Sequence, residues 1–147
     1  MTVLSAEVEQ LLLSCPRAVL VTLRGARPPR AVPICFAIAH GQLVTPIDEK
    51  PKRDHDVWRL GRLRDIERDP RVVVLADRWN ADWSTLAWVR LEGTAAIVER
   101  GDQRPLALEA LRSRYLPYRS MRLEHLPLIV VEPERVATWT AMGTRRG

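Results

Sequence analysis

Two lysines stand close together in a chain that places arginine at nearly every other basic position. Lys50 and Lys52 are the two lysines among 23 basic residues, and the other 21 are arginines. Pro51 restricts the backbone between them, and Arg53 follows directly. A lysine ammonium is a compact charge suited to phosphate oxygens, whereas an arginine guanidinium is a planar fork. The segment 48–53 therefore predicts an anion site, with phosphate as the expected ligand.

The residues on either side of this segment allow two interpretations of its charge. A helix is predicted over 54–68 with Asp54 as its N-cap, and the free backbone N–H groups at its start would add partial positive charge. Alternatively, the segment is a solvated loop whose basic charges are balanced by nearby acids: Asp48, Glu49, Asp54 and Asp56. The charge pattern alone does not decide between a bound anion and this internal balance.

The cysteines and histidines do not predict a metal or thiol centre. Cys15 and Cys35 form no C-x-x-C pair and lie in apolar surroundings, so buried free thiols are expected. The three histidines, at positions 40, 55 and 125, are too scattered to supply a zinc ligand set. No serine–histidine–aspartate arrangement and no pair of tuned carboxylates is visible, so no catalytic residue is nominated.

Composition indicates one soluble domain over residues 1–147. The chain is 46% hydrophobic and 28% charged, as in an ordinary globular protein. No apolar run approaches the roughly 20 residues that a membrane helix needs. The segment 12–15, LLSC, resembles a lipoprotein cleavage site, but Glu7 and Glu9 stand where a positively charged leader would be required. A cytoplasmic protein without membrane attachment is expected.

The basic balance of the chain suggests an anionic partner of some kind. Net charge is +5 and the sequence pI is about 10.0, values that suit nucleic acid, membrane phosphates or a small anionic ligand. Nucleic acid is not favoured, because arginines alternate with acids in RLRDIERDPR (62–71) and no series of stacking aromatics is present. A small-molecule partner is expected instead.

Hydrophobic periodicity predicts antiparallel strands with helices between them. Helices are predicted over 4–14, with Ser5 as N-cap, over 54–68, and over 102–116 with Leu106, Leu108, Leu111 and Tyr115 as its apolar positions. Strands are predicted over 17–23, 30–39, 42–47, 71–77 and 82–99, followed by two final strands over 128–133 and 135–141. His40-Gly41 indicates a tight hairpin, and Gly93 indicates a bulge or bend.

This order of elements favours a small closed barrel of six or seven antiparallel strands. Strands and helices do not alternate strictly, and no G-x-G-x-x-G is present, so a parallel dinucleotide-binding sheet is not expected. The fold class is mainly β with interposed α, in one domain.

A resemblance to a known family rests on four segments, in this order: PICFAI (33–38), DEKPKR (48–53), LRDIERDPRVVVLAD (63–77) and DWSTLAWVRLEG (82–93). The chain resembles the pyridoxamine 5'-phosphate oxidase-like split β-barrels that bind FMN. Among them it is most similar to the actinobacterial flavin/deazaflavin oxidoreductases that use coenzyme F420. The resemblance runs from about residue 8 to residue 141.

This resemblance implies a homodimer with each cofactor in a groove between the two subunits. It implies that Lys50 and Lys52, with Arg53, hold the cofactor phosphate and that Thr45 lies beside the tricyclic ring. The backbone at Pro33, Ile34 and Cys35 would pass along that ring. Trp83 and Ser84 would approach from the facing subunit.

Each of these roles has a simpler alternative in packing. Ile34 and Cys35 would be core residues in any barrel. Trp83 and Trp88 are five positions apart, so an unbulged strand would aim them at opposite faces, with Trp83 toward the groove and Trp88 toward the core or an interface. Two positions depart from the family: Ala87 stands where close relatives often carry tryptophan, and Pro46 removes a backbone donor.

The reaction implied by the resemblance is hydride transfer between reduced F420 and a small conjugated organic substrate, with the protein supplying orientation and exclusion of water. One alternative is an FMN-dependent oxidoreductase of the same fold, which would purify yellow. Another is a protein that binds F420 or flavin without turnover. Fold alone does not choose among these functions.

Overall fold

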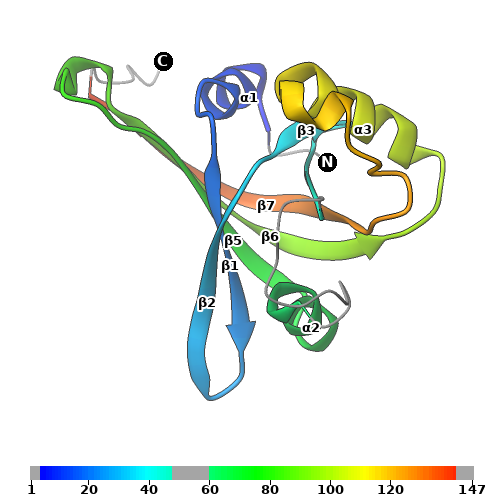
Figure 1. Ribbon diagram of the computed structural model, residues 1–147. Coiled ribbons are helices and arrows are strands. Elements are labelled where there is room, and N and C mark those ends of the chain that lie inside the picture. The colour runs from blue at the N-terminus through cyan, green and yellow to red at the C-terminus, as the bar shows by residue number, and fades with distance from the viewer. Residues whose placement is uncertain (1–3, 48–59, 142–147) are drawn as a thin grey trace.

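One antiparallel sheet forms the centre of the computed structural model, which describes residues 4–47 and 60–141 (Figure 1). Its order is β2-β1-β5-β6-β7-β4-β3, and every neighbouring pair is antiparallel. The strands are β1 (Ala18–Arg24), β2 (Arg27–Ile34), β3 (Ala37–Ala39), β4 (Gln42–Pro46), β5 (Arg71–Arg78), β6 (Ala87–Val98) and β7 (Leu128–Thr140). The prediction of a mainly β fold with six or seven antiparallel strands is confirmed.

The two edge strands of this sheet are consecutive in the chain. β2 ends at Ile34 and β3 begins at Ala37, so Cys35 and Phe36 alone separate one edge from the other. The single strand expected over 30–39 is therefore divided, because β2 pairs with β1 whereas β3 pairs with β4. A sheet whose opposite edges are joined by two residues must curl, which gives the split barrel its shape.

One hairpin turn and one bulge occur at glycine positions where the sequence predicted them. His40 and Gly41 both have positive φ, 52° and 71°, which is the geometry of a two-residue type I′ hairpin between β3 and β4. In the β6–β7 ladder Glu92 lies opposite Arg135 and Gly93 opposite Pro133, so one residue of β7 is extra at that point. A Cβ at position 93 would lie 2.2 Å from a main-chain oxygen of β7, which explains the glycine.

β7 is one strand and not the two that the sequence predicted. It passes through the bulge without ending, with β6 on one side and β4 on the other. A bulge interrupts the ladder for one residue but lets the strand continue, so Pro133 and Glu134 bend the strand without breaking it.

The first two helices contribute to the inner face of the curled sheet. α1 (Ala6–Leu13) begins after Ser5, whose hydroxyl accepts a 3.2 Å hydrogen bond from the Val8 N–H, as predicted. α2 (Gly61–Arg68) begins later than expected: Leu60 occupies its N-cap position without a side-chain hydrogen bond, and the predicted cap Asp54 lies outside the described residues. Leu12, Leu63 and Ile66 pack with the alternate inward residues of β1, β5 and β6.

The third helix covers the outer face of the sheet at its β4 and β7 end. α3 (Gln103–Arg114) buries Ala107, Leu108 and Leu111 against Val44 and Val130. Leu106, predicted to be an inward residue, is 49% exposed. After α3 come a short 3-10 turn, η3 (Leu116–Arg119), and the segment that returns to β7.

No helix covers the outer face over β1, β5 and β6 within the described residues. Figure 1 shows the β1–β2 hairpin projecting beyond the rest of the sheet. None of the described helices is long and apolar enough to cross a membrane.

Candidate functional site

Three of the predicted cofactor residues stand at the end of edge strand β2. Pro33 is exposed and lies opposite Val19 of β1 on the outer face, whereas Ile34 lies opposite Ala18 and is 7% exposed in the core. Cys35 is half-buried in the link to β3. Because β2 is an edge strand, the backbone groups on its free side have no strand partner among the described residues. The main chain, and not the Ile34 side chain, is what this segment offers to a ligand.

Thr45 lies on β4, at the end of the sheet that carries the Cys35 link. It pairs with Ile129 of β7, and its side chain is 2% exposed. The β3–β4 ladder ends with Ala37 opposite Val44, so Thr45 lies one residue beyond its last pair, with its side chain buried. Proximity of Thr45 to Cys35 stays a prediction. Pro46 continues the strand despite its missing donor.

The predicted phosphate ligands Lys50, Lys52 and Arg53 lie outside the described residues. Their proposed contact with a phosphate stays a prediction.

Trp83 and Ser84 lie in a short 3-10 turn, η2 (Trp83–Thr85), and not in the strand that was predicted to begin at 82. The Asp82 carboxylate accepts hydrogen bonds from the Ser84 N–H and hydroxyl at 3.1 and 2.6 Å, and this favours the turn over a strand. Trp83 and Trp88 were expected to lie on one strand and to face opposite sides of it. They do not share a strand, because β6 begins only at Ala87.

An exposed aromatic pair marks the same turn. The rings of Trp79 and Trp83 have centroids 6.4 Å apart at an angle of 51°, and each residue is 69% exposed. The Asn80 amide donates to the Thr85 hydroxyl at 2.7 Å, which holds the turn closed beneath them. These two tryptophans are available for contact with another molecule.

A shallow groove crosses the uncovered outer face of the sheet. It measures about 560 Å³ and combines apolar strand residues with both signs of charge; its lining is Val21, Leu23, Arg71, Val72, Val73, Glu92, Gly93, Glu134 and Arg135. Next to it Val19 of β1 faces Leu75 of β5, which is 40% exposed. The groove volume falls within the roughly 300–1,000 Å³ of small-molecule sites.

A second, smaller cavity lies between the β1–β2 hairpin and α2. It measures about 100 Å³ and is lined by Arg24, Arg27, Arg30, Gly61, Arg64, Asp65 and Arg68; we call it the arginine pocket. The sequence did not predict it, because its residues come from two segments more than 30 positions apart. The available signal was Arg64 and Arg68, four apart and so on one face of a helix.

A buried carboxylate ties the two walls of the arginine pocket together. Asp65 is 3% exposed, and its Oδ2 accepts hydrogen bonds from the Thr22 hydroxyl at 2.6 Å and from Arg30 Nε at 2.9 Å. α2 is thereby joined to β1 and β2 by charge-assisted hydrogen bonds in a sheltered position. The side chain of Arg30 is 32% exposed.

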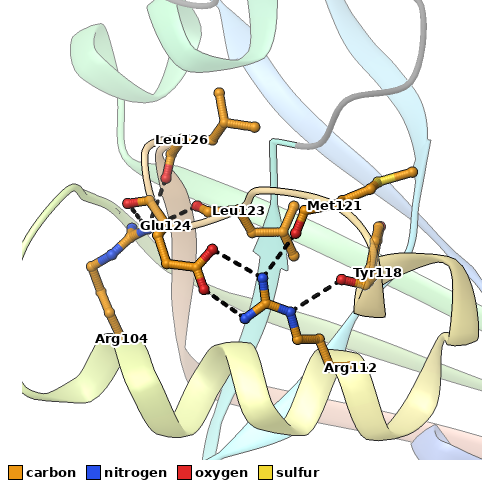
Figure 2. A network of polar contacts seen from close by, with 7 residues as sticks. All are labelled: Arg104, Arg112, Tyr118, Met121, Leu123, Glu124 and Leu126. Atoms are coloured by element: carbon orange, nitrogen blue, oxygen red, sulfur yellow. Dashed lines mark hydrogen bonds and ion pairs between the residues drawn. The ribbon is translucent and has the colours of Figure 1, made fainter.

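A polar network on α3 has a structural role (Figure 2). Arg104, 6% exposed, donates to the carbonyl oxygens of Val98, Leu123, Glu124 and Leu126. Arg112 forms two hydrogen bonds to the Glu124 carboxylate at 2.7 and 3.0 Å. These bonds hold the pKa of Glu124 at about 2, well below its ordinary value, while burial lowers the pKa of Arg104. The network fixes the segment before β7.

Among the described residues no group of three or more metal-ligating side chains comes together. Both cysteines are free, and burial raises the pKa of the Cys15 thiol.

Solved structures with low sequence identity share the fold. A conserved hypothetical protein from Mycobacterium tuberculosis has a TM-score of 0.72 at 21% identity, with 95% of this chain and 87% of that chain covered. A FAD-binding protein from Mesorhizobium loti has a TM-score of 0.63 at 18% identity, covering 92% and 94%. A heme binding protein from Mycobacterium smegmatis has a TM-score of 0.65 at 18% identity, covering 96% and 60%.

Sequence comparison gives the family directly. No curated protein sequence matches the chain. The family model described as pyridoxamine 5'-phosphate oxidase matches residues 4–140, which is nearly the whole chain. The split barrel, with its two edge strands joined at Cys35 and Phe36, agrees with that match. The chain therefore belongs to the pyridoxamine 5'-phosphate oxidase family.

Proposed function

We propose that the protein is an oxidoreductase that binds coenzyme F420 and transfers a hydride between the reduced coenzyme and a small conjugated organic substrate. The observation that carries this proposal is the family match over residues 4–140. The choice of F420 within the family is supported by the resemblance of segments 48–53 and 82–93 to deazaflavin-dependent members. The reaction class follows from the cofactor, which supplies the hydride-donating carbon when bound.

Two features of the described residues could receive a planar ring. The outer-face groove of about 560 Å³ is lined by apolar and charged strand residues, none of which is among the predicted cofactor residues. Edge strand β2 leaves main-chain donors and acceptors on its free side. Such backbone groups can orient the polar edge of a ring system without any particular side chain.

Each predicted site residue is assigned one role toward the cofactor. Pro33, Ile34 and Cys35 present backbone to the ring, and Thr45 supports them from β4. Lys50, Lys52 and Arg53 hold the phosphate. Trp83 and Ser84 reach the cofactor of the facing subunit and help to exclude water from it. No residue of the chain is assigned a proton-transfer role.

A homodimer is part of the same proposal. The uncovered face over β1, β5 and β6 carries Val21, Val73 and Leu75, beside the oppositely charged residues Glu92 and Arg135 that face one another across the β6–β7 ladder. A two-fold interface needs a surface complementary to itself, and an apolar area beside charges of both signs meets that need.

The dimer is tested with two exposed leucines on different faces. Leu75→Glu places a charge on the proposed interface, whereas Leu106→Glu does so on α3, where the leucine is 49% exposed. Light scattering after size exclusion should give a monomer for Leu75→Glu and a dimer for Leu106→Glu. A monomeric wild type, or a dimer that survives Leu75→Glu, would contradict the proposed interface.

The cofactor is tested by quenching of tryptophan fluorescence with F420, FMN and FAD in parallel. F420 should bind most tightly, and Lys52→Ala should weaken its binding by about 1.5–3 kcal/mol, the scale of one charge-assisted hydrogen bond. Arg100→Ala removes an exposed charge away from all the residues assigned to the cofactor and should leave affinity unchanged. Equal affinity of wild type and Lys52→Ala for F420 would contradict the phosphate assignment.

The flavin alternative has a specific observation in its favour. One of the solved structures with this fold is a FAD-binding protein, and the family is named after an oxidase. A yellow protein that retains flavin through purification and binds F420 weakly would establish this second function. Tight F420 binding without oxidation of the reduced coenzyme by a panel of quinones and enones would indicate a cofactor-binding protein instead.

A further inference from the structure

One hydroxyl group joins three separate segments at the point where the chain crosses from one edge strand to the other. Tyr115 directly follows α3, and its side chain is half-buried. Its hydroxyl accepts a hydrogen bond from the Phe36 N–H at 3.1 Å and donates one to the Pro16 carbonyl oxygen at 2.8 Å. The end of α3 is thereby tied both to the crossing between β2 and β3 and to the segment that leads from α1 into β1.

The crossing consists of Cys35 and Phe36, which we call the link, and it belongs to neither neighbouring ladder. The β1–β2 pairing ends at Ile34 and the β3–β4 pairing begins at Ala37, so the hydrogen-bond partner of the Phe36 N–H is a side chain. A backbone donor left unpaired away from water is costly. Because a peptide group is planar, the hydroxyl that holds this N–H also fixes the direction of the carbonyl group before it, that of Cys35.

Arg114 holds the same hydroxyl in place. Its Nε donates to the Tyr115 hydroxyl at 3.1 Å, and with the two bonds above the one donor and two acceptor positions of this hydroxyl are all used. The same guanidinium donates to the carbonyl oxygens of Leu13 and Cys15 and lies 4.8 Å from the centroid of the Phe36 ring. Phe36 is 0% exposed, so the link is held both by its backbone and by its ring.

We propose that Tyr115 is a positioning residue for the cofactor: its hydroxyl sets the orientation of the peptide group between Cys35 and Phe36, and with it the backbone that faces the ring. This inference rests on the proposed function, which assigns the backbone of Pro33, Ile34 and Cys35 to the ring. Backbone that is fixed before a ligand arrives loses little entropy when the ligand binds. Tyr115 acts through the link and is given no contact with the cofactor itself.

Hydrogen exchange of the ligand-free full chain tests whether the hydroxyl holds the link. Tyr115→Phe removes the hydroxyl and keeps the ring, which packs against the ring of Tyr118 with centroids 5.5 Å apart. The Phe36 amide, followed by NMR, should exchange about tenfold faster or more in Tyr115→Phe than in wild type, because its hydrogen bond is lost. Equal exchange in the two proteins would overturn the proposal.

Titrations followed by tryptophan fluorescence test the role toward the cofactor, with F420, FMN and FAD added to wild type and to Tyr115→Phe. The cofactor that wild type binds most tightly should bind the variant about three- to tenfold more weakly, the effect of one hydrogen bond between neutral groups. Faster exchange at Phe36 with unchanged affinity would overturn the proposal, because binding would then not require the link to be held.

Ser5→Ala is the matched control. It also removes a hydroxyl that holds a backbone N–H, in this case that of Val8 within α1, and loss of such a cap destabilises a protein about as much as loss of one hydrogen bond. Ser5→Ala should change cofactor affinity less than about twofold and leave exchange at Phe36 unchanged. Equal weakening of binding by Ser5→Ala and Tyr115→Phe would overturn the proposal, since general destabilisation would then explain both. Circular dichroism establishes that each variant is folded.

The same titrations separate this inference from the proposed function. F420 binding that Tyr115→Phe leaves unchanged would overturn the role of Tyr115 and leave the proposed function standing. Tightest binding of FMN or FAD, weakened in Tyr115→Phe, would overturn the choice of F420 and support the role of Tyr115. A wild type that binds none of the three cofactors would overturn both.

Discussion

Replacement of Arg104 by methionine should destabilise the protein strongly, although it removes no apolar side chain from α3. Arg104 Nη1 donates to the Val98 carbonyl oxygen at 2.7 Å, and Nη2 donates to three further carbonyl oxygens at 2.9–3.2 Å. Methionine keeps most of the stem volume but supplies no donor, so these buried or half-buried oxygens lose their partner. Figure 2 shows how the guanidinium reaches the segment around Leu123 and Leu126.

The size of the effect can be estimated from these contacts. Each hydrogen bond from a charged donor contributes about 1.5–3 kcal/mol, but two nitrogens share four acceptors and burial of the guanidinium offsets part of the gain. We expect a loss of about 3–5 kcal/mol, the usual cost of removing one partner from a buried charged network. For a chain of this length that corresponds to a decrease in melting temperature of about 6–20 °C.

Urea unfolding followed by circular dichroism measures this loss. Arg100→Met serves as the matched control, because Arg100 is exposed and makes no hydrogen bond with another described residue; it should lie within about 0.5 kcal/mol of wild type. Limited proteolysis of Arg104→Met should cut first within 115–127, the segment that the guanidinium holds. A stability equal to that of Arg100→Met would refute the role given to Arg104.

Three further predictions concern separate parts of the fold. Gly93→Ala should lower stability by about 1–3 kcal/mol in urea, because its Cβ meets a main-chain oxygen that cannot move away. The pKa of Glu124 is lowered, so its ion pair with Arg112 stabilises the fold fully above pH about 4.5 and loses this contribution as the pH falls toward about 2. The melting temperature of Glu124→Gln should therefore depend less on pH over this window than that of wild type. The same dependence of melting temperature on pH in both proteins would contradict this. A thiol reagent should modify half-buried Cys35 of the native protein before Cys15, because Cys15 is 0% exposed and its thiol has a raised pKa. Mass spectrometry measures the rate of modification at each cysteine. Equal rates would show that Cys15 is not protected.

Local signals in the sequence predicted one helix cap, one hairpin and one bulge correctly. Ser5 caps α1, His40 and Gly41 form the hairpin, and Gly93 stands at a bulge, because each of these depends on a few neighbouring residues. Asp82 shows the limit of the strand pattern: a short polar side chain that bonds to the backbone two residues later outweighs the apolar alternation around it.

Features that depend on distant residues were predicted poorly. Leu106 is exposed because the inward face of α3 runs through Arg104, Ala107, Leu108 and Leu111, and a hydrophobic pattern does not recognise an arginine as an inward residue. Three of the four carbonyl oxygens that accept hydrogen bonds from Arg104 belong to Leu123, Glu124 and Leu126, about 20 positions away. The arginine pocket was missed for the same reason, since its two walls meet only in the folded sheet. The family resemblance gave the fold, while all the assigned cofactor-binding residues, the lysines included, stay a prediction.

The position of β7 has a consequence for how the protein is made on the ribosome. It is the last strand of the described chain to emerge, yet it stands between β6 and β4 and joins the two parts of the sheet. Until it is synthesised, β6 has a free edge at twelve pairing positions and the short β3–β4 hairpin has no neighbour. A nascent chain in this state exposes a long edge to other nascent chains. We expect translational pausing before β7 has emerged from the ribosome to favour aggregation, and folding of the sheet to be completed only after β7 has emerged.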